Sequence, residues 1–416
     1  MTADAAPLRG LATRVPAAAL AAGVGCLALL VVAVAAAYPE TSPLSPDRAG
    51  GDTSWSWLYL GAISASFACY LGGLAALSRR AAALVPVLVI AVVIQLAPLA
   101  GPVLLSTDVY TYWAYGRVGA VHGANPYEVP PSTFPDDPAY ARMGADWRDT
   151  TTVYGPGFTL ASEGVAAVVG SSGDAAAWIY RIGAAAAMLA LTALAALLAR
   201  RRALACAFVG WNPLLAVHFA GGGHNDAPMM ALVVGAIAAA AYGHRQLAGA
   251  AWPAAIAVKW VPAMFFALRG VEARATGRSV RHLGFAVSAA VLLAVSIWRY
   301  GFGWLGAVVP LAENLEKQAV YSIPHRLSGL GISQDAAAFL LGGLFVLAFV
   351  WLLREAWRGR ARLALAAALL LLATPWLVPW YAVWAVALAA FDEDDRLARG
   401  LALVISAYLL RDAVPL

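Results

Sequence analysis

The chain has 416 residues, of which 62% are hydrophobic and only 12% are charged, and its 28 Lys or Arg and 23 Asp or Glu give a net charge of +5. An ordinary soluble domain is about 45–50% apolar and about 25% charged. The composition therefore excludes a cytosolic enzyme, a disordered protein and a nucleic-acid-binding domain as leading interpretations, and no nucleic-acid partner is expected. At roughly 20 apolar residues per span, there is room for about ten to thirteen membrane helices.

In chain order, the first predicted element is an apolar run that follows Arg9 and Arg14. The run is longer than a signal-peptide core, and the basic residues before it place the N-terminus inside. We expect membrane helices wherever such runs recur. They lie at about 16–37, 55–78, 82–105, 175–199, 203–219, 226–243, 283–298, 334–353, 363–375, 379–391 and 400–414.

Two further apolar stretches do not fit a simple span. The stretch 157–170 is short and contains Glu163, which favours an interfacial or re-entrant helix. The stretch 247–268 carries Lys259 near its middle and Pro262 just after it, and basic residues flank both ends. Basic flanks place both ends in the cytoplasm, so the pattern favours a broken, re-entrant hairpin that turns near Lys259 over a plain span.

Charged residues are unevenly distributed between the segments expected on the two sides of the membrane. The segments expected inside are 1–15, 79–80, 200–202, 244–246, 269–282, 354–362 and 392–399. The segments expected outside are 38–54, 106–174, 220–226 and 299–335. The inside set holds 18 Lys or Arg and 7 Asp or Glu, and the outside set holds 7 and 15. Because Lys and Arg bias orients membrane helices, the net charge is an orientation signal rather than a patch for acidic partners.

Two outer loops, about 106–174 and 299–333, interrupt the apolar runs. The first is rich in Pro, Asp, Tyr and Trp. A loop of that length is usually functional or disordered, and its aromatic residues argue for order. With no internal repeat and no polar tail, we expect one integral-membrane domain over 1–416 and an all-α polytopic fold.

Asp108 stands where a predicted span meets the first outer loop. If 106–117 is helical, Asp108, Tyr112 and Tyr115 share one face. A carboxylate beside aromatic rings at a membrane edge is partly desolvated and suits a general base. An N-cap role explains the same residue equally well.

Three consecutive polar residues, His224, Asn225 and Asp226, follow three glycines and open the next apolar run. Glycines let backbone approach a ligand closely, and a helix N-terminus favours anions. A Gly-rich turn with an N-cap is the plain alternative. A metal site is the weakest of the three, because one His with one Asp is a poor ligand set.

Three other groups carry chemistry at predicted membrane depth or in the outer loops. Lys259 either binds a phosphate or forms a structural ion pair. His325 and Arg326 either contact a phosphate, since Arg gives bidentate contacts, or belong to a solvated loop. Trp380 and Tyr381 lie at a helix corner, where they form an interfacial aromatic belt or stack on a sugar ring.

Taken as an ordered set from about residue 105 to 385, these segments resemble the actinobacterial polyprenol-phosphate-mannose-dependent mannosyltransferases. The resemblance is strongest to the α-(1→6)-mannopyranosyltransferases that build lipomannan-type glycolipids. The matching pieces are Asp108-Val-Tyr, Gly116-Arg117, Asn125-Pro-Tyr127, Tyr154-Gly-Pro156, Asn212-Pro213, Gly222-Gly-His-Asn-Asp226, Val258-Lys259 and Pro379-Trp-Tyr381.

The resemblance implies a C-type glycosyltransferase (GT-C) fold, with about 11–13 transmembrane helices and interfacial helices in the first outer loop. It implies an acidic base there, which is Asp108 here. The partners would be a polyprenyl-phosphate sugar, a glycolipid or lipoglycan acceptor and membrane lipids. Transfer would invert the sugar, giving an α-mannoside on the outer side of the plasma membrane. No cofactor or metal is called for, because phosphate is already a fair leaving group.

Within this scheme, four cationic or ionisable residues are candidates for binding the donor phosphate, because the leaving group needs positive charge: Arg117, His325, Arg326 and Lys259. The candidates for binding sugar or acceptor are Tyr112, Asn125, Tyr127, His224, Asn225, Asp226, Trp380 and Tyr381. Two alternatives stay open: the same fold using an arabinosyl or glucosyl donor, and a transporter or flippase. The absence of a visible repeat disfavours the second.

Overall fold

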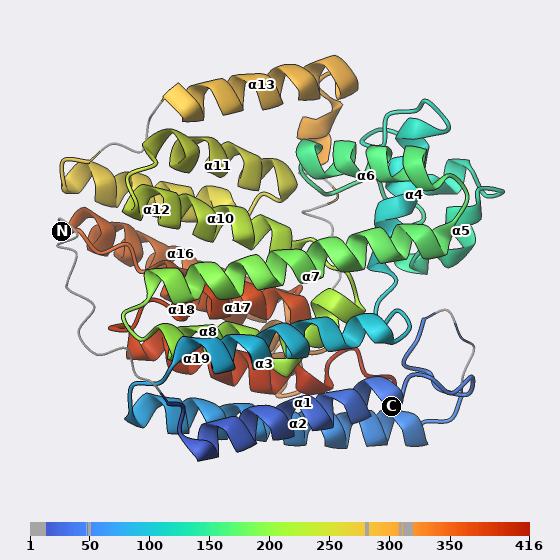
Figure 1. Cartoon of the computed structure of the whole chain (residues 1–416). Coiled ribbons are helices and arrows are strands. Elements are labelled where there is room, and N and C mark those ends of the chain that lie inside the picture. Colours follow the sequence, from blue (N-terminus) through green and yellow to red (C-terminus); the bar gives the residue numbers. More distant parts are fainter. Residues whose placement is uncertain (1–13, 47, 49–50, 279–282, 308–309, 311–318) are drawn as a thin grey trace.

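A computed structural model describes residues 14–46, 48, 51–278, 283–307, 310 and 319–416. All regular secondary structure among the described residues is helical, with no strand, which confirms the prediction of an all-α polytopic membrane protein. Most helices run side by side as a bundle, and a smaller group gathers at one of its ends (Figure 1).

Five described helices are long and apolar enough to cross a membrane: α1 (Ala17–Ala35), α2 (Ser54–Arg79), α7 (Gly173–Leu198), α13 (Leu283–Tyr300) and α16 (Gln334–Trp357). On α13 and α16 large apolar side chains face outward, with Trp298 81% and Phe339 86% exposed. Such surfaces suit contact with lipid, where helices satisfy all their own backbone groups.

The remaining predicted runs are also helical, but they are shorter or broken. The pair α8 (Arg202–Gly210) and Pro213–Gly221 bends by 50°, because Asn212 caps a new helix at Pro213. The number of long spans, five or six among the described residues, is therefore smaller than the predicted number of transmembrane helices. The shorter helices are α3 (Leu84–Leu96), α10 (Asp226–Ala241), α17 (Leu363–Ala373), α18 (Ala382–Ala389) and α19 (Arg396–Tyr408).

The stretch around Lys259 is broken, as its sequence predicts. Helix α11 (Arg245–Val258) ends one residue before Lys259, and α12 (Pro262–Ala275) begins three residues after it. In Figure 1, α12 returns alongside α11 toward the end of the bundle from which α11 started. Pro262 opens α12 at a position where proline is favoured, because its missing N–H would have no helical partner. The turn thus holds Lys259 at the far end of the hairpin.

The segment 106–174, predicted as the first outer loop and still called by that name below, folds into short helices beyond the bundle: α4 (Asp108–Ala120), α5 (Pro138–Arg142) and α6 (Pro156–Val169). Helix α4 runs across the ends of the long helices (Figure 1). It packs closely on α6, because Gly116 and Gly119 face Ser162 and Glu163, where an added Cβ would collide. The predicted short helix at 157–170 is present, and it packs on α4 outside the bundle.

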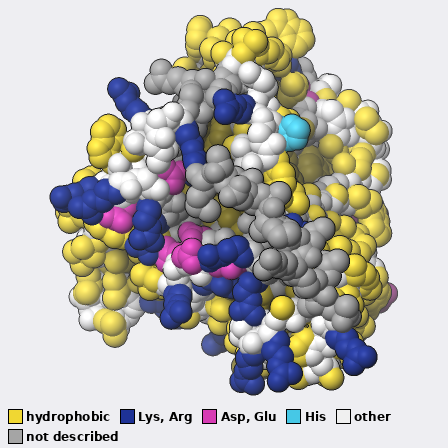
Figure 2. Space-filling model, turned by 60° about the vertical axis from the view of Figure 1, so that its left-hand side comes forward, with side chains coloured by type: hydrophobic (Ala, Val, Ile, Leu, Met, Phe, Trp, Pro, Cys, Tyr) yellow, Lys and Arg dark blue, Asp and Glu magenta, His cyan; other side chains and the backbone are white. Residues whose placement is uncertain are grey.

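The opposite end of the bundle carries turns rich in arginine. Arg200 and Arg201 lie in the turn that joins α7 to α8, and Arg358 and Arg360 lie in the turn that joins α16 to α17. Arg245 is the first residue of α11, directly after the turn from α10. Figure 2 shows Lys and Arg side chains gathered over this face, with acidic side chains among them and hydrophobic flanks on either side. We call this the arginine end, and the opposite one, with α4 to α6, the loop end.

Candidate active site

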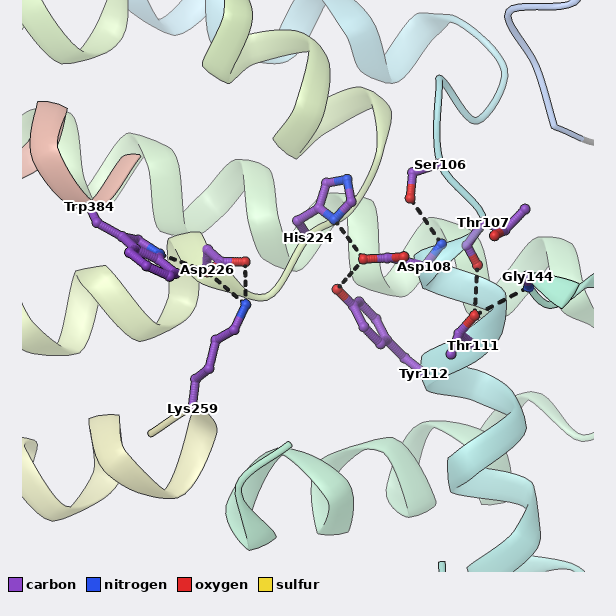
Figure 3. Close-up of polar contacts among 10 residues, drawn as sticks. All are labelled: Ser106, Thr107, Asp108, Thr111, Tyr112, Gly144, His224, Asp226, Lys259 and Trp384. Carbon is purple, nitrogen blue, oxygen red and sulfur yellow. Dashed lines mark hydrogen bonds and ion pairs between the residues drawn. The ribbon is translucent and has the colours of Figure 1, made fainter. Parts of the chain in front are cut away.

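Helix α4 begins at Asp108, and Thr107 precedes it as the N-cap residue. The backbone N–H of Asp108 donates to Ser106 Oγ at 3.1 Å. Its carboxylate turns away from the helix end and accepts from His224 Nδ1 at 3.1 Å and from the Tyr112 hydroxyl at 3.3 Å (Figure 3). Of the two roles that the sequence left open, the side chain of Asp108 does not serve as the N-cap.

The carboxylate of Asp108 is held without being enclosed. Both of these hydrogen bonds reach Oδ2, and among the described residues no hydrogen bond reaches Oδ1. The side chain is 17% exposed, whereas His224 is fully buried. Asp108 therefore keeps one carboxylate oxygen free to accept a further hydrogen bond, which a general base needs.

The surroundings also keep this carboxylate ionised. Burial alone would raise the pKa of Asp108, but the hydrogen bond and charge of His224, the charge of Lys259 and the hydroxyl of Ser106 together lower it below its usual value. An ionised carboxylate is the form that can accept a proton. Asp108 lies outside the spans, in the first outer loop.

His224 is fixed by packing as well as by Asp108. Its ring stacks on Trp380, with centroids 3.6 Å apart and planes 12° from parallel. The loop before it passes tightly against α4 because Gly223 adopts φ +72°, and an added Cβ there would collide with Val109. A φ of this sign is open to glycine at little cost. The glycines thus serve to bring His224 onto Asp108.

Next to this pair lies a second one, between Asp226 and Lys259. Lys259 Nζ donates to both oxygens of Asp226, at 2.8 and 2.9 Å, and Trp384 Nε1 donates to Oδ1 at 2.7 Å. The ammonium group also lies 4.6 Å from the ring centre of Tyr381. Asp226 is fully buried and Lys259 is 14% exposed. The structural ion pair that the sequence allowed for Lys259 is present.

Asn225, between His224 and Asp226, is 2% exposed, and neither its side-chain nitrogen nor its oxygen has a partner among the described residues. Nε2 of His224 is in the same condition. Buried polar groups are almost always hydrogen-bonded, so each exception calls for an explanation. The unsatisfied amide that follows His224 is a group that a polar ligand such as a sugar can complete.

Three other predicted site residues are engaged elsewhere. Arg117 Nε donates to both oxygens of Asp137, at 2.8 and 2.9 Å, and its Nη1 donates to the carbonyl of Gly170. Asn125 donates to the carbonyl of Tyr300, and the Tyr127 hydroxyl donates to the carbonyl of Tyr154. These contacts hold the parts of the first outer loop to one another and to α13. Arg117, Asn125 and Tyr127 are therefore not part of the candidate site.

The predicted residues of the second outer loop lie on the short helix α15 (Ile323–Ser328). Arg326 donates to the Tyr408 hydroxyl, and His325 Nδ1 is 3.2 Å from Gln334 Nε2. Among the described residues, neither forms a hydrogen bond or ion pair with Asp108 or Lys259. The second outer loop is only partly described, because 308–309 and 311–318 lie outside the described residues.

Comparison with known proteins identifies the family. Residues 8–273 match the family described as alpha-(1→6)-mannopyranosyltransferase, N-terminal domain. The chain belongs to this family. It is 27% identical to a probable alpha-(1→6)-mannopyranosyltransferase of Mycolicibacterium smegmatis and 30% identical to alpha-(1→6)-mannopyranosyltransferase A of Mycobacterium tuberculosis. No solved structure matches the chain.

The two alignments cover 69% and 72% of this chain, but 62% and 64% of the relatives. The chain therefore spans less than two thirds of the length of the curated relatives it matches. The part that matches the mannopyranosyltransferase family contains Asp108, His224, Asn225, Asp226 and Lys259. The rings that pack on them, Trp380, Tyr381 and Trp384, lie beyond it.

Trp384 is the site residue that sequence reasoning missed. It lies three residues after Tyr381, at the spacing that puts two side chains on one helix face, and the two rings stack with centroids 4.2 Å apart. This spacing could have indicated Trp384 once Tyr381 was a candidate. The bond from Trp384 to Asp226 depends on α18 packing against α10 and could not be predicted from spacing alone.

Proposed function

We propose that this chain transfers mannose from a polyprenyl-phosphate-mannose donor to a glycolipid or lipoglycan acceptor, inverting the sugar to give an α-mannosidic, α-(1→6) linkage. The observation that carries the proposal is Asp108, an ionised, partly exposed carboxylate with a free oxygen, held by His224, which precedes the unsatisfied amide of Asn225 in the sequence. The family, whose relatives are named for mannosyl transfer, supplies the sugar and the linkage.

In the proposed step, a hydroxyl of the acceptor gives its proton to Asp108 while its oxygen attacks the anomeric carbon of the β-linked sugar. A new carbon–oxygen bond forms, the bond to the phosphate oxygen breaks, and the electron pair leaves with the phosphate. Attack from the face opposite to the phosphate converts the β linkage into an α linkage. The carboxylate ends the step protonated, and the phosphate ends it as a polyprenyl phosphate.

Among the predicted phosphate-binding residues, Lys259 is best placed. An ammonium group has three N–H donors, and two of them already point at Asp226, which leaves one for a phosphate oxygen. The rings of Tyr381 and Trp384 restrict the ammonium group from the other side. Charge placed in advance on the leaving group stabilises the transition state without reorganisation. His325 and Arg326 remain further candidates on α15.

The orientation we propose puts the site on the outer face of the plasma membrane and the N-terminus in the cytoplasm. The separation of the arginine end from Asp108, at opposite ends of the bundle, supports it (Figures 1 and 2). Because arginine-rich turns stay on the cytoplasmic side, the loop end would face outward. A lipid-borne donor and a lipid-anchored acceptor would both reach it from within the membrane plane.

The test measures transfer of radiolabel from polyprenyl-phosphate-mannose to an oligomannoside acceptor by wild type, Asp108→Asn and Asp174→Asn. Asp174 is a matched control, because its carboxylate also lies in the first turn of a helix at the loop end but is 80% exposed and pairs with Arg142. Asp108→Asn should lower the rate by about 10²- to 10⁴-fold, the usual worth of a general base, and Asp174→Asn should not. Intact transfer by Asp108→Asn overturns the base assignment.

Arabinosyl and glucosyl polyprenyl phosphates, offered in the same assay, test the choice of sugar. Faster transfer from either of these two would replace mannose in the proposal. Failure of the wild-type protein to transfer any of the three sugars would overturn the proposed activity as a whole. That result would favour a transporter or flippase with the same fold.

A further inference from the structure

A cavity of about 300 Å³ opens directly beside the start of α4. Three segments far apart in the sequence form its walls: Pro43, Leu44 and Pro46 from the loop between α1 and α2, the residues 105–107 that lead into Asp108, and Ala413 with Pro415 near the end of the chain. Its volume is at the lower end of the range of small-molecule sites, about 300–1,000 Å³.

The walls of this cavity hold the backbone in an unusual conformation. Among the described residues, only two that are not glycine have positive φ, Leu105 at 60° and Ala413 at 62°, and both line the cavity. The hydrogen bond from Leu105 N to the carbonyl of Leu44 fixes one of them, and the bond from Ala413 N to Asp412 Oδ1 fixes the other. Backbone strain of this kind gathers where a ligand is bound.

The cavity lies against the residues that lead directly into Asp108, on the side away from the cation (Figure 3). Ser106 lines it and also accepts the N–H of Asp108. In Figure 3, Asp108 lies between Ser106 and Thr107 on one side and the Asp226–Lys259 pair on the other. A molecule held in the cavity would therefore approach Asp108 from the side opposite to Lys259.

The chemistry of the walls fits a neutral sugar better than a phosphate. The described lining residues are Pro, Leu, Ala, Ser and Thr, and none carries a charge. A donor phosphate needs a cation, and Lys259 supplies one on the other side. Apolar side chains with a few hydroxyl groups suit a sugar ring, whose faces are apolar and whose edge carries hydroxyls. Among the described residues the hydroxyl of Thr107 forms no hydrogen bond.

We propose that this cavity binds the terminal sugar of the acceptor and delivers its hydroxyl to Asp108, an inference that rests on the proposed transferase function. The donor phosphate then occupies the Lys259 side, and the two substrates meet at Asp108 from opposite directions. This arrangement fits inversion, in which the attacking oxygen and the leaving phosphate lie on opposite faces of the sugar.

Two variants of the full chain test the cavity through Michaelis constants measured separately for the oligomannoside acceptor and the polyprenyl-phosphate-mannose donor. Ala413→Trp fills the cavity and adds only bulk, because alanine already carries a Cβ at this φ. Thr107→Val removes one hydroxyl without a change of shape. We expect Ala413→Trp to raise the acceptor KM by about tenfold or more and Thr107→Val by several-fold, with the donor KM unchanged, the signature of lost binding.

Val121→Trp is the matched control for added bulk, since Val121 is 50% exposed and lies at the far end of α4. A thermal unfolding midpoint establishes that each variant is folded. If Ala413→Trp does not fold, Thr107→Val decides the question. An acceptor KM that stays at the control value, or a rise in the donor KM instead, overturns the cavity assignment while transfer by wild type continues. Absence of transfer by wild type overturns the proposed function itself.

Discussion

A hydrogen-bonded carboxylate lies at each end of helix α4: Asp108 begins the helix, and Asp137, the N-cap residue of α5, pairs with Arg117 in its last turn. The two differ in how fully they are paired. At its start, Asp108 accepts two side-chain hydrogen bonds, both on Oδ2. Near its end, Asp137 accepts two bonds from Arg117, one from His122 Nε2 at 2.7 Å and one from the backbone N–H of Ala139 at 2.9 Å. Asp137 therefore has no oxygen left for a substrate.

Ionisation does not separate these two carboxylates. Burial would raise the pKa of Asp137, but Arg117, the N–H of Ala139 and His122 lower it, just as His224 lowers the pKa of Asp108. What separates them is the unused oxygen of Asp108 and the cavity beside it. The comparison teaches that a lowered pKa on an outer-loop carboxylate marks a structural pair as readily as a base, and that spare hydrogen-bonding capacity distinguishes the two.

Of the substitutions at these two carboxylates and their partners, we expect Asp137→Asn to have the largest effect, and the effect is on stability. Asp137 is 7% exposed, so its loss leaves the buried Arg117 guanidinium without a counter-charge. Breaking one partner of a buried pair typically costs about 3–5 kcal/mol. Thermal unfolding in detergent should show this loss, whereas transfer per folded molecule should stay close to wild type. A collapse of transfer in protein that remains folded would put Asp137, rather than Asp108, in the reaction.

Much of the fold can be predicted from sequence patterns. Apolar runs, Ala content and the positions of arginines are read from the sequence without knowledge of how the helices pack. The broken hairpin at Lys259 is an example, since a central lysine and Pro262 with basic flanks permit few other arrangements. Asp108, His224 and Asn225 are also visible as polar residues where a membrane run begins or ends.

The pairing of the remaining side chains depends on how the helices approach one another. Arg117 reaches Asp137, 20 positions later in the sequence, because the chain between them folds back over α4. No periodic pattern signals that return. Asp226 and Lys259 lie 33 residues apart on separate elements, so each residue could be predicted to matter without its partner being known. The bond of Trp384 to Asp226 has the same origin.

An intermediate effect is expected when the partner of Asp108 is removed. His224→Leu takes away the bond and charge that oppose burial, so the pKa of Asp108 rises, with Lys259 and Ser106 left to lower it. Because the base must be ionised, kcat/KM is lost as pH falls through that pKa. The loss should therefore begin at higher pH in the variant than in wild type.

A hydrogen bond to a charged group contributes about 1.5–3 kcal/mol. Because His224→Leu removes such a bond from Asp108, its kcat should also fall by about ten- to a hundredfold. His224→Asn retains an N–H near the position of Nδ1 and should recover part of both effects. A variant whose acid limb coincides with that of wild type, in protein shown to be folded, would make His224 a packing residue that has no influence on Asp108.

The smallest effect concerns the second bond to Asp108. The Tyr112 hydroxyl lies 3.3 Å from Oδ2, and its ring is fixed edge-on between Tyr154, Phe158 and Tyr180, with centroids 5.0–5.3 Å away. Tyr112→Phe keeps this packing and removes only the hydroxyl, which should cost about 0.5–1.5 kcal/mol and slow transfer by several-fold. The acid limb should move in the same direction as in His224→Leu, but less. If Tyr112→Phe slowed transfer as much as His224→Leu, the hydroxyl would take part in the reaction itself. The difference between Asp108 and the fully paired Asp137 would then depend on Tyr112 as well as on the free oxygen of Asp108.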